Sequence, residues 1–127
     1  MDNTIFIVED NPVINDLISW RLTELGFQIK DSAGDFETAM EKLSQYGPEE
    51  LPALVLMDIN LPGDTDGIMA ATEIQKRYQI PIVYISSLMD DAVIERARQT
   101  RPRGYIVKPF TDNQLKATVE MALQKSE

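Results

Sequence analysis

Three continuous apolar runs limit how this chain can fold. They read IFIV, ALVLM and IVYI, and lie at residues 5–8, 53–57 and 82–85. An apolar run without alternation is typical of a parallel strand that helices cover on both faces. Weaker runs at 27–29 and 105–107 raise the expected number of strands to five. The pattern therefore predicts an α/β fold, a three-layer α/β/α sandwich around a five-stranded parallel sheet.

Helical segments are expected between these runs. The first should begin at Asn11 and Pro12, which suit a helix start, and should end at Gly26. Its inward-facing apolar stripe is expected to comprise Ile14, Leu17, Ile18, Leu22 and Leu25. The other helices are expected at residues 36–46, 67–78, 90–99 and after the potential cap Thr111. Strands that alternate with helices in this way imply right-handed crossovers.

Residues that can take part in chemistry follow four of the strand-like runs. Glu9 and Asp10 follow IFIV, Asp58 follows ALVLM, Ser86 follows IVYI, and Lys108 follows GYIV. In an open parallel sheet the carboxyl ends of the strands share one edge, and ligands bind in the crevice outside that edge. The sequence therefore predicts that these residues form one site.

The chemistry of this set suits phosphoryl transfer. Carboxylates this close repel one another, so their pocket is stable mainly with a cation in it, and Mg²⁺ prefers such oxygen ligands. Asp58 can act as a nucleophile, because carboxylates form acyl phosphates in known enzymes. Lys108 supplies a positive charge, and Ser86 offers a hydroxyl donor to a phosphoryl oxygen. Each part meets a need of phosphoryl transfer.

Each of these residues also has an ordinary structural interpretation. Asp10 can cap a helix, Ser86 can simply leave a strand, and Lys108 can be a solvated lysine. Asp58 is one of 21 acidic residues in the chain. Their joint order, each at the end of its own strand, favours the functional interpretation.

Size and composition suggest one globular domain over residues 1–127. A chain of 127 residues can bury one sizeable core but not two. It contains no apolar run near the ~20 residues that span a bilayer, and no secretion signal, so we expect no membrane insertion. The absence of cysteine excludes disulfides and thiolate metal sites and suits a cytoplasmic location.

The net charge and the lack of histidine argue against two further classes of function, nucleic-acid binding and histidine-dependent catalysis. The formal net charge is −9, which argues against direct nucleic-acid binding, because such binding depends on Lys and Arg. The chain has no histidine, which removes Ser-His-Asp and Cys-His catalysis. Any chemistry must then use carboxylates, hydroxyls, lysine and bound metal.

Taken in order, these motifs resemble the receiver domain of two-component response regulators. The resemblance runs from VEDNP through LVLMDINLPG and PIVYISS to GYIVKPF. It implies the flavodoxin-like strand order 2-1-3-4-5. It further implies a phosphorylatable signalling switch rather than an enzyme, one that catalyses only its own phosphorylation and dephosphorylation.

The resemblance also assigns roles to individual residues. Asp58 would be the phosphoacceptor, and it would hold Mg²⁺, or Mn²⁺ in its place, together with Glu9, Asp10 and the backbone carbonyl of Asn60. Ser86 would be the switch hydroxyl, Tyr105 the aromatic switch and Lys108 the lysine of the site, with a cis Lys108-Pro109 bond. Three residues would occupy positions that tune the phosphoryl lifetime, namely Asn60, Ser87 and Leu88.

The mechanism that the resemblance implies needs a partner. A sensor histidine kinase or a phosphotransfer protein would donate a phosphoryl group from its phosphohistidine to Asp58. Ser86 would turn inward and Tyr105 would follow, which changes the face formed by the fourth helix, fifth strand and fifth helix. That face would contact an effector or a second copy of the chain.

Two surface features have two interpretations each. Five cations fall within 13 residues, namely Arg96, Arg98, Arg101, Arg103 and Lys108. They form either a solvated helix face or a contact surface for a second copy or an effector. Val13 and Trp20 lie off the core stripe of the first helix, and either anchor the kinase or phosphotransfer helix or pack partly against a neighbouring helix.

One loop departs from the pattern of the family. LPGDTDG carries an extra residue before Gly67 and places Asp64 and Asp66 near the site. A harmless insertion is favoured, because surface loops tolerate extra residues; altered donor choice or metal affinity is the other interpretation.

Two other functions remain to be weighed. An aspartyl-phosphate phosphohydrolase of the haloacid dehalogenase type needs Asp-x-Asp after its first strand, and this chain has Glu9-Asp10-Asn11. A flavin-binding protein of the same fold needs a hydroxyl-rich phosphate loop there, which the chain lacks.

Overall fold

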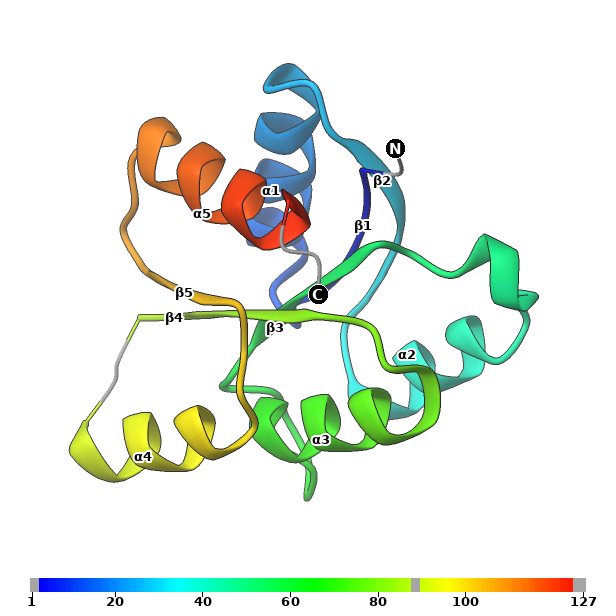
Figure 1. The fold of residues 1–127 in the computed structure, drawn as a ribbon. Coiled ribbons are helices and arrows are strands. Elements are labelled where there is room, and N and C mark those ends of the chain that lie inside the picture. The colour runs from blue at the N-terminus through cyan, green and yellow to red at the C-terminus, as the bar shows by residue number, and fades with distance from the viewer. Residues whose placement is uncertain (1–2, 88–89, 125–127) are drawn as a thin grey trace.

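The computed structural model describes residues 3–87 and 90–124, and strands and helices alternate along these residues (Figure 1). Its strands are β1 (Thr4–Val8), β2 (Gln28–Ala33), β3 (Leu54–Asp58), β4 (Ile82–Ser86) and β5 (Gly104–Val107). Its α-helices are α1 (Pro12–Glu24), α2 (Phe36–Leu43), α3 (Gly67–Tyr78), α4 (Asp91–Gln99) and α5 (Asp112–Gln124). Leu88, which the resemblance singles out, lies outside the described residues.

The sheet confirms the predicted topology. Its order is β2-β1-β3-β4-β5, and every neighbouring pair is parallel. Helices α1 and α5 cover one face, and α2, α3 and α4 cover the other (Figure 1). Side chains of β1 alternate between the layers: Ile5 and Ile7 pack toward α1 and α5, Phe6 and Val8 toward α2 and α3. Burial on both faces explains why the central strands are apolar without alternation.

The start and end of α1 are as predicted, but its inward stripe is wrong at one position. Asn11 Oδ1 accepts hydrogen bonds from the N–H groups of Val13 and Ile14, and Gly26 has a φ of +102° just after the helix. Leu17 is 46% exposed, whereas Asn15 is buried. The Asn15 carboxamide donates to the Glu9 carbonyl at 3.1 Å, and this bond offsets the free-energy cost of burying a polar side chain.

Three features differ from the sequence prediction: the end of α2, the stretch that follows it, and the length of β2. Helix α2 ends at Leu43 rather than at residue 46, because the N–H groups of Gln45 and Tyr46 bond to carbonyls three residues back and tighten the chain into a turn. A short 3₁₀ helix, η1 (Pro48–Glu50), then follows in a stretch expected to be irregular. Strand β2 is longer than predicted and continues through polar residues to Ala33.

The described helices also bear on membrane insertion. Within residues 3–87 and 90–124, no helix combines the length and the apolar character that crossing a membrane requires.

Candidate functional site

Three carboxylates meet at the carboxyl edge of the sheet and form what we call the acidic cluster: Glu9, Asp10 and Asp58. Each places one oxygen within 4.8 Å of the others. Glu9 and Asp58 are buried, with 2% and 3% exposure, while Asp10 is exposed. The residues come together because β1 and β3 are neighbours in the sheet. A set of hard oxygen donors with one solvent-facing member fits Mg²⁺, which keeps part of its water shell.

Asp58 is electrostatically unusual. Burial raises the pKa of its carboxyl to about 6, although the backbone N–H of Asn60 donates to Oδ1 at 3.0 Å and acts in the opposite direction. The negative charge of Glu9 raises the pKa further, and the positive charge of Lys108 lowers it. The ionised form of Asp58 is therefore destabilised by its surroundings and is stabilised by added positive charge.

Lys108 brings the fifth strand into the site. Its Nζ lies 3.0 Å from Glu9 Oε1, and most of its side chain is buried. The backbone N–H of Lys108 donates to the Ser86 carbonyl at 2.9 Å, which fixes the chain just after β5. The Lys108-Pro109 bond is cis, as the resemblance implies. The ammonium group is thus held beside the acidic cluster as a counter-charge.

Glu9 is held from several directions. Its backbone N–H donates to the Ala33 carbonyl at 2.9 Å, and its Oε2 accepts from the N–H of Asn11 at 3.2 Å. The carboxamide of Asn15 holds its carbonyl. Asn15 was missed in the sequence, although a polar residue three positions before Ile18 on an inward face was a usable signal.

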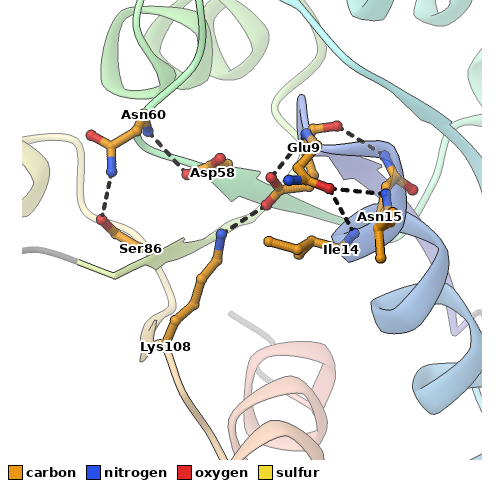
Figure 2. A network of polar contacts seen from close by, with 9 residues as sticks. Glu9, Ile14, Asn15, Asp58, Asn60, Ser86 and Lys108 are labelled. Atoms are coloured by element: carbon orange, nitrogen blue, oxygen red, sulfur yellow. Dashed lines mark hydrogen bonds and ion pairs between the residues drawn. The ribbon is translucent and has the colours of Figure 1, made fainter.

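Ser86 and Asn60 are joined on the other side of Asp58. Ser86 is the last residue of β4 and is fully buried. Asn60 Nδ2 donates to Ser86 Oγ at 3.2 Å, and the Ser86 hydroxyl points to that carboxamide (Figure 2). The resemblance gave Asn60 a metal-binding carbonyl and a position that tunes the phosphoryl lifetime, and both roles stay predictions. The side-chain contact was not predicted.

Tyr105 contacts β4 and α4. Its ring centroid lies 6.0 Å from that of Tyr84, and its hydroxyl donates to the Ile94 carbonyl at 3.5 Å. Burial raises the pKa of Tyr105. The residue is therefore placed to couple the sheet to α4, while its role as a switch stays a prediction.

The loop after β3 depends on Gly67. A Cβ at this position would lie 2.0 Å from the Asp58 carbonyl oxygen, so only glycine fits. Next to it, Asp66 caps α3 through the N–H of Met69 and pairs with Arg96 Nη2 at 3.0 Å. Asp64 is exposed. The aspartate nearest the helix thus has a structural role, and the effect of the extra loop residue stays open to experiment.

Comparison with known proteins points to one family. The model of the response regulator receiver domain matches residues 5–120. The transcriptional regulatory protein PdtaR of Mycobacterium tuberculosis is 34% identical over 121 residues, which cover 95% of this chain and 57% of that protein. The chain thus spans little more than half the length of this curated relative.

Solved structures agree with the sequence matches. The signal receiver domain of a modulated diguanylate cyclase from Desulfovibrio desulfuricans has a TM-score of 0.86 at 28% identity, covering 98% of this chain and 95% of its own. The receiver domain of NtrX from Brucella abortus has a TM-score of 0.84 at 30% identity, covering 96% of this chain and 99% of its own.

Proposed function

The chain belongs to the family of response regulator receiver domains of two-component systems, and on this premise we propose that it is a switch phosphorylated on Asp58. The observation that carries the proposal is the position of Asp58. This buried carboxylate has a pKa of about 6 and lies with Glu9 and Asp10 at the sheet edge, with Lys108 alongside. The family assignment leaves the phosphohydrolase alternative without support.

The acidic cluster would hold the metal of this reaction. Glu9, Asp10 and Asp58 supply carboxylate oxygens, and the resemblance adds the Asn60 carbonyl. When bound, Mg²⁺ neutralises negative charge on the transferring phosphoryl group. Mn²⁺ takes the same kind of ligand.

The residues of the chain carry the transfer itself. An oxygen of Asp58 attacks the phosphorus of a partner's phosphohistidine. A P–O bond forms while the P–N bond breaks, and the departing imidazole nitrogen takes up a proton. The ammonium group of Lys108 moves from Glu9 to a phosphoryl oxygen. The Ser86 hydroxyl donates a hydrogen bond to another phosphoryl oxygen. On this proposal the chain catalyses only its own phosphorylation and dephosphorylation and is not an enzyme for external substrates.

The exposed face of α1 is the surface we propose for the phosphodonor. Val13, Leu17 and Trp20 are 74%, 46% and 60% exposed and recur at helical spacing. The helix starts at Pro12, directly after the acidic cluster, so a partner helix packed here places its histidine near Asp58. An exposed tryptophan suits the centre of such a contact.

The output face is proposed to be formed by α4, β5 and α5. Among its residues, Ile94 and Val107 are exposed and apolar, and Tyr105 lies partly exposed between α4 and β4. Most cations of the predicted basic patch already bond to other groups of this chain. Arg96, Arg98 and Lys108 pair with carboxylates, and Arg103 donates to the Ala122 carbonyl. An effector or second copy would then rely on apolar contacts more than on arginines.

Intact-mass spectrometry tests the proposal. After incubation with acetyl phosphate and Mg²⁺, the protein should gain a single phosphoryl group. Asp58→Asn, or a chelator added to the wild type, should abolish the gain, and Asp64→Asn should not. A gain that survives in Asp58→Asn would contradict the assignment of the acceptor.

A further inference from the structure

Asn60 donates one hydrogen bond to each of two residues of the site. Its backbone N–H reaches Asp58 Oδ1 at 3.0 Å, and its carboxamide reaches Ser86 Oγ at 3.2 Å (Figure 2). The two contacts use different parts of the residue. Truncation of the side chain to alanine therefore removes the contact with Ser86 and keeps the backbone N–H that donates to Asp58.

We infer that the Asn60 carboxamide is a latch that holds the Ser86 hydroxyl in the resting state and competes with the phosphoryl group for it. Asn60 is thus a positioning residue that acts through Ser86. The inference rests on the proposed function, because it needs a phosphoryl group on Asp58 to attract Ser86.

Rotamer geometry makes the two partners exclusive. Serine hydroxyls occupy staggered positions, and a change from one to another about χ1 moves Oγ by roughly 2 Å. A bond already 3.2 Å long does not survive such a shift in the absence of a matching movement of Asn60. Ser86 therefore has to leave the carboxamide when it turns toward Asp58.

The difference in burial between Ser86 and Asn60 makes the latch reversible. Ser86 is fully buried, whereas Asn60 is exposed. On release, the carboxamide can bond to water, so no buried donor is left unpaired. The net strength of one neutral hydrogen bond corresponds to a shift of about three- to tenfold in the equilibrium. The latch is strong enough to bias the resting state and weak enough for a phosphoryl group to overcome.

The first experiment tests whether the bond acts in the resting protein. Urea unfolding of the metal-free wild type, Asn60→Ala, Ser86→Ala and the double variant forms a double-mutant cycle. We expect a coupling of about three- to tenfold in the unfolding equilibrium constant. Additive effects of the two substitutions would overturn the latch.

The second experiment tests competition with the phosphoryl group. Beryllofluoride, a tetrahedral analogue of a phosphoryl group, is titrated calorimetrically into the same proteins with Mg²⁺ present. Asn60→Ala should bind about three- to tenfold more tightly than the wild type. The same substitution in the Ser86→Ala background should change nothing, and Asn113→Ala, an exposed position on α5, should match the wild type.

The outcomes separate the latch from the proposed function. Equal affinities of the wild type and Asn60→Ala, or a gain that persists without the Ser86 hydroxyl, would overturn the latch and leave the acceptor role intact. No binding by any of these proteins would overturn the acceptor role of Asp58 and the latch with it.

Discussion

Lys108 illustrates how single side chains of the site depend on one another. It is 3.0 Å from Glu9, and its charge lowers the pKa of Asp58. We expect Lys108→Ala to keep Mg²⁺ binding, since the acidic cluster is unchanged, and to slow phosphorylation by acetyl phosphate about a hundredfold, because a charge that stabilises the transferring group is lost. Calorimetry and intact-mass time courses measure the two effects.

The control for this prediction is a lysine of the same chain. Lys116→Ala, at an exposed position of α5, should leave both binding and phosphorylation unchanged. A Lys108→Ala protein that is phosphorylated at the wild-type rate would show that the ammonium group only balances Glu9.

The buried carboxyl of Asp58 should make stability depend on pH. Its pKa is about 6 in the folded protein and roughly 3.9 in an unfolded chain, so the folded state binds more protons between these values. Stability is therefore greatest below the unfolded value, falls as pH rises through about 6 and is then constant. For the metal-free protein we expect a loss of about 1 kcal/mol between pH 5 and pH 7.5 from this group.

Urea unfolding in EDTA at these two pH values measures the effect. Asp58→Asn removes the titrating group and should reduce the pH dependence by that amount, and saturating Mg²⁺ should do the same for the wild type. Equal pH dependence in the wild type and Asp58→Asn would show that this carboxyl is ionised as readily as in the unfolded chain.

Gly67 gives a steric prediction next to the site. A Cβ there would lie 2.0 Å from the Asp58 carbonyl oxygen and 2.6 Å from the Ile59 Cα, and backbone atoms cannot move away cheaply. We expect Gly67→Ala to lower the free energy of unfolding by about 3 kcal/mol or more. Gly63→Ala is the matched control, because its φ of +89° is strained for alanine but no atom lies within 4 Å, so the cost should be only ~1–2 kcal/mol. Equal losses in urea unfolding would contradict the steric argument.

The sequence predicted the residues assigned to phosphoryl transfer and metal binding better than the residues that hold them in place. Glu9, Asp58 and Lys108 could be found because each follows a recognisable strand, and strand ends share an edge. The burial of Asn15 had a usable signal in the helical spacing. Its contact with Glu9 and the contact of the Asn60 carboxamide with Ser86 could not be predicted, because they depend on how the loops after β1 and β3 pass over the sheet. The clash at Gly67 likewise exists only once α3 is packed against Asp58.

At the scale of elements, the end of α4 is anchored by a chain of hydrogen bonds. The Thr100 hydroxyl donates to the Ala97 carbonyl at 2.6 Å, so it accepts from the hydroxyl of Tyr84 at 2.8 Å. Gln75 Nε2 also donates to the Thr100 carbonyl at 2.9 Å, which ties α3 to the same point. The end of α4 is therefore fixed to both β4 and α3.

This anchor predicts a non-additive pair of substitutions. Thr100→Val should lower the free energy of unfolding by about 1–3 kcal/mol, because it leaves the buried hydroxyl of Tyr84 unpaired. Adding Tyr84→Phe should recover part of this loss, since no polar atom is then left unsatisfied. Urea unfolding of both single variants and the double variant measures the coupling, and strict additivity would contradict the anchor.

Element boundaries were predictable where the hydrophobic pattern was strong. The three continuous apolar runs correspond to β1, β3 and β4, which are covered on both faces. Strand β2 was underestimated because it lies at the edge of the sheet and carries polar residues that are only partly buried. Helix α2 ended early and η1 was missed, because local backbone bonds rather than apolar spacing set those boundaries.

At the scale of the whole molecule, the sheet brings together residues almost a hundred positions apart. Glu9 and Lys108 meet because β1 and β5 end on the same edge, and Ser86 lies on the strand between β3 and β5. From this edge, β4 and β5 lead to α4 through Tyr84 and Tyr105. We therefore expect charge added at Asp58 to change the α4–β5–α5 face and to leave the opposite edge of the sheet unchanged.

Hydrogen–deuterium exchange before and after phosphorylation by acetyl phosphate measures this change in the α4–β5–α5 face. We expect altered protection in peptides from α4 and β5, no change in β2 and α2, and no change anywhere in phosphorylated Lys108→Ala. A full phosphoryl adduct on Asp58 with unchanged exchange in α4 and β5 would contradict the claim that this chain is a conformational switch.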